Sequence, residues 1–270
     1  MPYMEIKSYE FKFSDIYLVP IGDVHMGDEA FTKESRKKLE GYIDWVKKTR
    51  NAYIVLMGDL INVATLTSPT SPFKQNMNMT TQIENIVKLF TPVKDKILGV
   101  ITGNHEQRLE KSCGYNPTIT ICDRLGLNNG QYLGASGVIV FSLHDRNFTG
   151  YFHHTTGGGN TIGGKMNRAS KLREIIPNCD FYAGAHNHML GCVHSQVYSI
   201  AHSTKSREYR IEPIRQMIID TGGYLDYPDS YAEQMMLSPV KMGSPRIHLF
   251  TKEKITDSSV INEKDIHVSI

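Results

Sequence analysis

Short apolar runs alternate with amphipathic segments through the first hundred residues. Residues 15–21 (DIYLVPI), 52–57 (AYIVLM) and 97–102 (ILGVIT) have the length and composition of buried strands. Residues 33–50 and 81–90 space their apolar side chains as amphipathic helices do. A helix between successive strands is typical of βαβ units, so the pattern predicts an α/β fold.

Strand patterns outnumber helical patterns in the second half of the chain. Residues 137–143 and 148–154 are joined by a short polar turn, which predicts an antiparallel hairpin. A helix is expected at residues 165–176, and a long loop from Thr65 to Met79. Further strands are expected at the alternating N-terminus and at residues 179–186, 195–205, 209–223 and 245–254. This strand content predicts a second sheet packed on the first, within one domain spanning residues 1–270.

Composition excludes several classes of protein. Of the 270 residues, 40% are hydrophobic and 21% are charged, which excludes a disordered chain. The net charge of +2 argues against a protein that binds nucleic acid through overall charge. Four scattered cysteines without a C-x-x-C pair indicate neither a zinc ribbon nor a disulfide framework. With no signal-peptide pattern and no apolar run of about 20 residues, we expect a cytoplasmic protein without a membrane partner. The oligomeric state stays open.

Chemically active side chains are concentrated where the apolar runs end. They form five short groups: Asp23-Val24-His25, Gly58-Asp59, Gly103-Asn104-His105-Glu106, His153-His154 and His186-Asn187-His188. In open α/β sheets, ligands bind outside the carboxyl ends of the strands, so we expect these groups to meet at one site. Asp23 and His25 are two residues apart, as are His186 and His188, so each pair would point the same way on extended backbone.

Histidine, carboxylate and carboxamide side chains without thiolate predict a site for divalent metal ions. Such a set suits manganese, iron, zinc, cobalt or nickel better than calcium or an iron–sulfur cluster. Two ions roughly 3.5–4 Å apart can activate water and hold phosphoryl oxygens. A histidine with a pKa near ~6.5 beside them could supply the proton that a leaving alkoxide needs. We expect two divalent ions, with manganese as the first choice.

From residue 23 to residue 188 the sequence contains, in order, D-x-H, G-D-x-x-N, G-N-H-E, a strand-ending His and H-x-H. This series resembles the calcineurin-like metallophosphoesterases, including bacterial and bacteriophage members. The resemblance implies a four-layer α/β/β/α sandwich of two mixed sheets flanked by helices, with two metals at the carboxyl ends of the strands. It implies that Asp59 bridges the two metals. The other ligands would be Asp23, His25 and His188 for the first metal, and Asn104, His154 and His186 for the second. His105 would be the general acid, with Glu106 orienting it.

The sequence departs from the family pattern at three points. Ala185 separates Gly184 from His186, where the family usually has Gly-His-x-His. Thr155 follows His154 where the family usually has Gly. Consecutive strand residues face opposite ways, so only one of His153 and His154 can be a ligand, and we favour His154 because it is last before the glycine-rich turn. The second motif also lacks the Asp-Arg-Gly continuation of serine/threonine protein phosphatases, which weakens a protein phosphatase interpretation.

Three residues outside the ligand set are candidates for substrate binding. Arg108 could hold a phosphate through two hydrogen bonds, or could be a solvated arginine. Asn62 could hydrogen-bond a metal ligand, line the cleft or cap the next segment. Lys165 ends a glycine-rich stretch that partly matches a P-loop, but Met166 stands where Ser or Thr is required, so we expect it at the rim of the cleft. A basic patch is formed by Lys205, Arg207, Arg210 and Arg215. It could be a solvated strand face or could bind a phosphate-rich substrate.

The sequence therefore predicts a metal-dependent phosphoesterase, a hydrolase that acts on a phosphoester substrate. A phosphodiester, in nucleic acid or a nucleotide derivative, is the leading substrate class. The first alternative is a phosphomonoesterase, including one that acts on phosphoproteins. The second is a non-catalytic scaffold, which loss of ligand residues would have favoured, but every ligand type is retained. A nuclease would also require a basic track to the cleft and a steep salt dependence.

Overall fold

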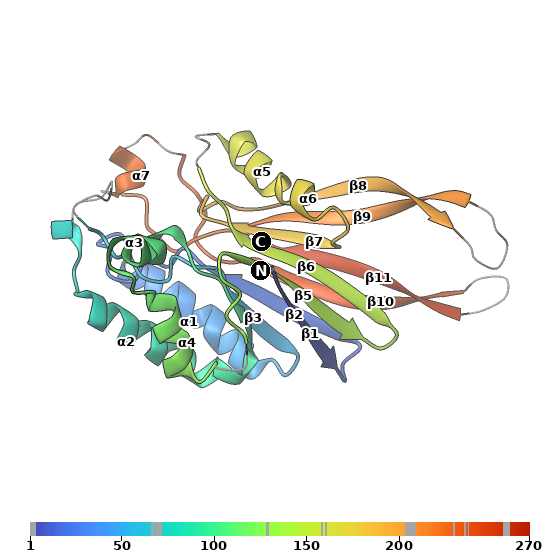
Figure 1. Ribbon diagram of the computed structural model, residues 1–270, viewed down its shortest axis with the longest axis horizontal. Helices are drawn as coiled ribbons and strands as arrows, with labels where there is room; N and C mark the ends of the chain where they lie inside the picture. The colour runs from blue at the N-terminus through green and yellow to red at the C-terminus, as the bar shows by residue number, and fades with distance from the viewer. Residues whose placement is uncertain are drawn as a thin grey trace.

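Two β-sheets packed face to face form the centre of the molecule, with helices on both outer faces (Figure 1). The computed structural model describes residues 4–65, 68, 72–127, 130–157, 159, 161–202, 209–228, 230–234, 236, 238–255 and 260–270. Lys205 and Arg207 of the basic patch lie outside these residues. The layers confirm the expected α/β sandwich of two mixed sheets flanked by helices.

The first sheet has five strands in the order β11-β10-β2-β3-β4. Its parallel part, β2 to β4, is built from the three apolar runs of the first hundred residues. These strands span Asp15–Ile21 (β2), Ala52–Leu56 (β3) and Ile97–Val100 (β4). The antiparallel part is the hairpin of β10 (Arg246–Ile255) and β11 (Val260–Ser269). The sequence pattern predicted β10 but not β11, which lacks a continuous apolar run.

The second sheet has six strands in the order β1-β5-β6-β7-β9-β8. The predicted hairpin of β5 (Ser136–Leu143) and β6 (Arg146–His154) lies in it, with β1 (Glu5–Phe11) parallel to β5. β7 (Phe181–Ala185) lies between β6 and β9, parallel to both. The long strands β8 (Leu190–His202) and β9 (Tyr209–Thr221) form the far edge. β8 begins five residues before the predicted strand.

Helices cover the outer face of each sheet. α1 (Lys33–Lys48), α2 (Met79–Phe90) and α4 (Pro117–Leu125) pack their apolar faces on the five-stranded sheet. α5 (Ile162–Ser170) and α6 (Leu172–Ile175) pack on the six-stranded sheet, so the helix predicted at 165–176 starts earlier and is interrupted at Lys171. The remaining helical segments are α3 (Asn104–Cys113), α7 (Tyr231–Gln234) and the 3₁₀ turns Pro72–Lys74 and Thr91–Lys96. None of the helices in the described residues is long and apolar enough to cross a membrane.

Burial of apolar side chains explains the four layers. One core lies between the two sheets and contains Leu18, Val55, Phe152 and Ile219, all less than 1% exposed. Two further cores lie between each sheet and its helices. Because β2, β3 and β4 are buried on both faces, their sequences are continuously apolar rather than alternating. The polar residues that follow them therefore mark the strand ends.

Candidate metal centre

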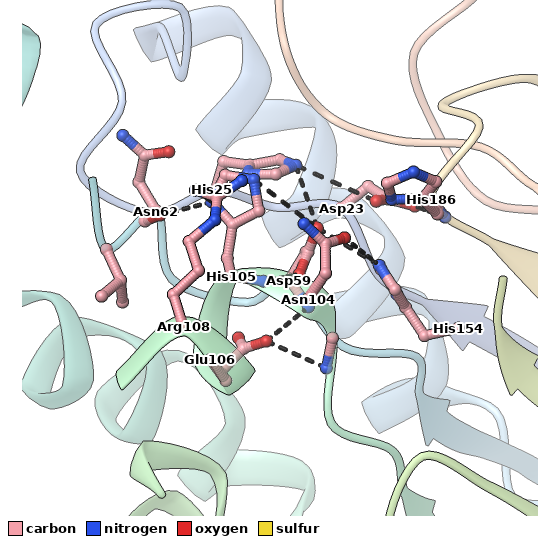
Figure 2. A network of polar contacts seen from close by, with 12 residues as sticks. Asp23, His25, Asp59, Asn62, Asn104, His105, Glu106, Arg108, His154 and His186 are labelled. Carbon is pink, nitrogen blue, oxygen red and sulfur yellow. Dashed lines mark hydrogen bonds and ion pairs between the residues drawn. The ribbon is translucent and has the colours of Figure 1, made fainter. Parts of the chain in front are cut away.

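The polar segments after β2, β3, β4, β6 and β7 come together at one edge of the two sheets (Figure 2). Backbone hydrogen bonds tie the first two segments to each other, from Asp23 N to Gly58 O (3.0 Å) and from His25 N to Asp59 O (2.9 Å). The structure thus brings together the residues that the sequence places at separate strand ends.

The backbone of these segments is left-handed, which the sequence analysis did not predict. Asp23, His25, Asp59, His186 and His188 have φ between +48° and +81°, a region that non-glycine residues seldom occupy. The expectation of extended backbone is therefore wrong for both pairs, although Asp23 and His25 still contribute to one group of side chains. His186 and His188 instead contribute to two different groups of side chains.

The first group consists of Asp23, His25 and His188. Nε2 of His25 lies 3.1 Å from Nε2 of His188, and Asp23 Oδ1 lies 3.5 Å from His188 Nε2 and 3.9 Å from His25 Nε2. Asp23 and His25 are buried, and the His188 side chain is 29% exposed. Three donor atoms that converge in this way can hold one metal ion.

The second group consists of Asp59, His154 and His186, with Asn104 beside it. His154 Nε2 lies 3.2 Å from Asp59 Oδ2 and 3.0 Å from Asn104 Oδ1. His154 Nδ1 donates a hydrogen bond to Met57 O (2.8 Å), which fixes the ring and leaves Nε2 facing the group. The groups found in the described residues contain His154 and not His153.

Asp59 lies between the two groups. Its Oδ1 accepts a hydrogen bond from His105 N (2.8 Å), so this oxygen is already engaged. Its Oδ2 faces His154 Nε2 (3.2 Å), His25 Nε2 (3.9 Å) and His105 Nε2 (3.8 Å). Asp59 Oδ2 is therefore the oxygen that faces both groups and could bind metal there.

The donor set fits divalent cations. Asp23 Oδ1, which faces His25 and His188, is buried without a hydrogen-bond partner. Two imidazole nitrogens 3.1 Å apart repel each other if both carry lone pairs, and a cation between them and the Asp23 carboxylate would remove that repulsion. A buried oxygen left unpaired is costly, and a cation bound beside Asp23 Oδ1 would supply the missing partner.

Burial and neighbouring charges shift the pKa values of the candidate ligands in both directions. It lowers the pKa of His188 to about 3 and of His186 to about 4, and it lowers the pKa of His25 as well, so all three rings are neutral at pH 7. Burial raises the pKa of Asp23 to about 7. Burial opposes ionisation of Asp59 too, but the histidines around it hold its pKa well below the usual value. Asp59 in turn raises the pKa of His154 to about 10 against the effect of burial, so a metal ion would displace a proton from that ring.

His105 faces the groups from the first turn of α3. Its Nδ1 contacts the carbonyl oxygen of Asn62, which can only accept, so Nδ1 carries the proton and Nε2 is directed at Asp59. Arg108 Nη1 lies 3.2 Å from the same Nδ1. Burial lowers the pKa of His105, and this effect outweighs the Asp59 carboxylate, which raises it. The charge of Arg108 lowers the pKa further.

Glu106 does not orient His105, contrary to the prediction. Its carboxylate is 1% exposed and accepts hydrogen bonds from four backbone N–H groups instead. Oε2 accepts from Asp59 N (2.9 Å) and Gly103 N (3.0 Å), and Oε1 from Leu60 N (2.7 Å) and Ile61 N (3.3 Å). Glu106 thus holds the segments after β3 and β4 together, while the Asn62 carbonyl orients His105. Figure 2 shows the Asn62 amide turned away from the histidines, so it is not a partner of the ligands.

Lys165, expected at the rim of the cleft, lines an apolar groove beside the start of β8. It is only 6% exposed, in the second turn of α5, where burial lowers its pKa. It lies near a pair that the sequence analysis missed, Asn187 and Asp220, whose side chains are hydrogen-bonded through Asn187 Nδ2 and Asp220 Oδ2 (2.9 Å). Asn187 Nδ2 also donates to Lys165 O (3.3 Å). Asn187 therefore ties the segment that carries His186 and His188 to β9 and α5. Its position inside H-x-H was the only signal for this role.

Comparisons with known proteins give a distant likeness in fold. No protein-family model and no curated protein matches the chain. A conserved uncharacterized protein of Streptococcus pneumoniae, a predicted phosphoesterase, is 11% identical over 94% of this chain and 99% of its own, with a TM-score of 0.34. The protein TT1561 of Thermus thermophilus is 8% identical over 74% of this chain and 99% of its own (TM-score 0.34). GAP50, the anchor in the inner membrane complex of Plasmodium, is 7% identical over 94% and 88% (TM-score 0.39). At such TM-scores, the chemistry must be inferred from the site itself.

Proposed function

We propose that this protein is a metal-dependent phosphoesterase that holds two divalent ions on either side of Asp59. The observation that carries the proposal is that Asp59 Oδ2 lies between the two groups of ligand atoms. It is 3.2 Å from His154 Nε2 in the second group and 3.9 Å from His25 Nε2 in the first. Besides Asp59, the ligands of one ion would be Asp23, His25 and His188. Those of the other ion would be Asn104, His154 and His186. Manganese suits this nitrogen and oxygen set.

His105 would act as the general acid. Two bound divalent ions would activate a water molecule and stabilise negative charge on a phosphoryl group. Because Nδ1 of His105 is committed to the Asn62 carbonyl, a second proton can reside only on Nε2, the atom that faces the ligand groups. From there it can be donated to the leaving alkoxide. Arg108 contacts the same ring and could hold a phosphoryl oxygen.

A phosphodiester is the proposed substrate class. Arg108 is the cation in direct contact with His105, and one guanidinium matches the single negative charge of a diester. An unactivated diester also has a poor leaving group, for which protonation by His105 matters most. A nucleotide derivative or nucleic acid would provide such a bond.

The test compares metal content and turnover in metal-stripped protein re-supplied with manganese. We expect two ions per chain by mass spectrometry of the metals, and faster hydrolysis of bis-p-nitrophenyl phosphate than of p-nitrophenyl phosphate. Asp59→Ala should lose metal and activity together, whereas Asp44→Ala, on the exposed face of α1, should change neither. Absence of bound metal would overturn the proposal, and a preference for the monoester would overturn the substrate class.

A further inference from the structure

β8 is a long edge strand without a charged residue. Its 13 residues, Leu190–His202, contain no Lys, Arg, Asp, Glu or Pro. It is the last strand of its sheet, so one of its edges is unpaired in the described part of the chain. Proteins usually protect such edges with charged residues, proline or short strand length. The other sheet edges follow this rule: β4 has only four residues, β1 carries Glu5, Lys7 and Glu10, and β11 carries Glu263, Lys264 and Asp265.

The contrast is sharpest within the ribbon that β8 forms with β9. β7 pairs with β9 only at Phe181–Gly184, opposite Met217–Asp220, so the earlier part of β9 pairs with β8 alone. Figure 1 shows this ribbon extending beyond β7. The β9 side of the ribbon is protected by four residues: Arg210, Glu212, Pro213 and Arg215. The β8 side has no such protection.

The outer half of the ribbon carries an exposed apolar face. Tyr198, Ile200, Tyr209 and Ile211 are each between 68% and 76% exposed. Ile200 lies opposite Ile211 in the register, and Tyr198 lies opposite Pro213, so these side chains share one face of the ribbon. Further along the strands the same face packs into the core between the sheets.

The inner half of β8 lies beside an apolar groove of about 370 Å³. Four consecutive strand residues line it, Leu190 to Val193, so the groove follows the strand edge rather than one face. Its other walls come from α5, the segment at 238–241 and the C-terminal residue. These walls include Ile162, Met166, Val240 and Ile270.

We propose that β8 pairs antiparallel with β8 of a second copy of this chain, joining the two six-stranded sheets into one. Full overlap of two 13-residue strands places Gln196 at the twofold axis. Ile200 then lies opposite the partner's Cys192, and Tyr198 lies opposite the partner's His194. The exposed apolar half of each strand thereby meets the groove beside the other strand, and this happens twice, as a twofold interface requires.

Charge and area both favour a second copy as the occupant. A strand without charged residues meets itself without like-charge repulsion. The paired edge is about 44 Å long and about 10 Å deep. Together with the exposed tyrosine and isoleucine side chains, it approaches the about 800 Å² per partner typical of stable interfaces. The groove also contains Met189, next to His188, so the partner's ribbon would lie beside the metal centre. The pairing does not depend on the proposed function.

The first test is the mass in solution, measured by light scattering during size-exclusion chromatography at about 50 µM chain. We expect a dimer of twice 30.5 kDa for the natural chain. Ile200→Lys should give a folded monomer, shown by an unchanged circular dichroism spectrum. The matched control is Ile6→Lys on the β1 edge, where the side chain is 64% exposed, and it should remain a dimer. A monomeric natural chain, or a dimeric Ile200→Lys variant, would overturn the proposal.

A second test fixes the strand register and does not rely on a destabilising change. In a Cys113→Ser background, Ile200→Cys should form an intermolecular disulfide with the partner's Cys192 on mild oxidation. The covalent dimer should disappear when Cys192→Ser is added. Ser199→Cys, which points to the opposite face, should not cross-link to Cys192. A dimer in which Ile200→Cys does not cross-link would overturn the antiparallel β8 pairing.

Discussion

Glu106→Gln separates the role that the structure gives to Glu106 from the role that sequence suggested. In the structure, the carboxylate holds the backbone N–H groups of four residues that follow β3 and β4. Glutamine has nearly the same shape but only one acceptor oxygen. Its NH₂ group would face two of the four N–H groups, so at least two buried donors would lose their partner.

The size of the effect follows from that count. A buried donor left without a partner costs about 1–3 kcal/mol, so two of them should lower the free energy of unfolding by about 2–6 kcal/mol. Because one of the four N–H groups belongs to Asp59 itself, metal affinity should fall as well. An orienting role at His105 would instead leave the unfolding free energy almost unchanged and reduce only turnover.

Urea unfolding of the metal-free protein, followed by circular dichroism, measures this difference. The matched control is Glu110→Gln, an exposed glutamate one turn further along α3, which should stay within about 0.5 kcal/mol of the natural chain. If Glu106→Gln also stays within that range, the backbone network does not hold the site together and our account of Glu106 is wrong.

Three further predictions concern residues in and around the candidate metal centre. His105→Gln should keep both metal ions but lower turnover by about 10²–10⁴-fold on alkyl phosphodiesters, and less on p-nitrophenyl esters; loss of metal would contradict its assignment as acid. Asn187→Leu should weaken manganese binding, measured calorimetrically, by about 10–100-fold, because the segment with His186 and His188 loses its tie to Asp220. Gly103→Ala should cost about 1–3 kcal/mol in thermal or urea unfolding, since its Cβ would lie 2.1 Å from Asp59 Oδ1, whereas Gly163→Ala, which has open space, should not destabilise.

The sequence was informative where a local pattern corresponds to a local structure. The continuous apolar runs predicted β2 to β4 because strands buried on both faces require such runs. Polar residues directly after those runs had to emerge at one edge of the sheet, so the co-location of Asp23, Asp59 and His105 could be predicted. Strand alternation limited the ligand to one of His153 and His154, and the position of His154 directly before the glycine-rich turn favoured it.

The supports of the site could not be predicted, because they are long-range contacts. The G-N-H-E motif indicated a catalytic role for Glu106. The same motif starts α3, and the helix directs the Glu106 carboxylate toward backbone N–H groups that are more than 40 residues away in the sequence. Asp220 lies 33 residues from Asn187 and has no motif of its own. Both connections depend on how segments pack, not on spacing along the chain.

The left-handed backbone of the ligand segments explains why such supports are needed. Five non-glycine residues at the site have positive φ, a conformation that costs about 1–3 kcal/mol each at strained functional sites. That cost must be offset by contacts that the extended form would not make. Asp23 Oδ2 accepts from His186 N, Asp59 Oδ1 accepts from His105 N, and Glu106 accepts from Asp59 N. Asp23 and Asp59 therefore each have two tasks, to present an oxygen toward the site and to fix a neighbouring segment. A substitution that removes both should cost more metal affinity than loss of one ligand atom.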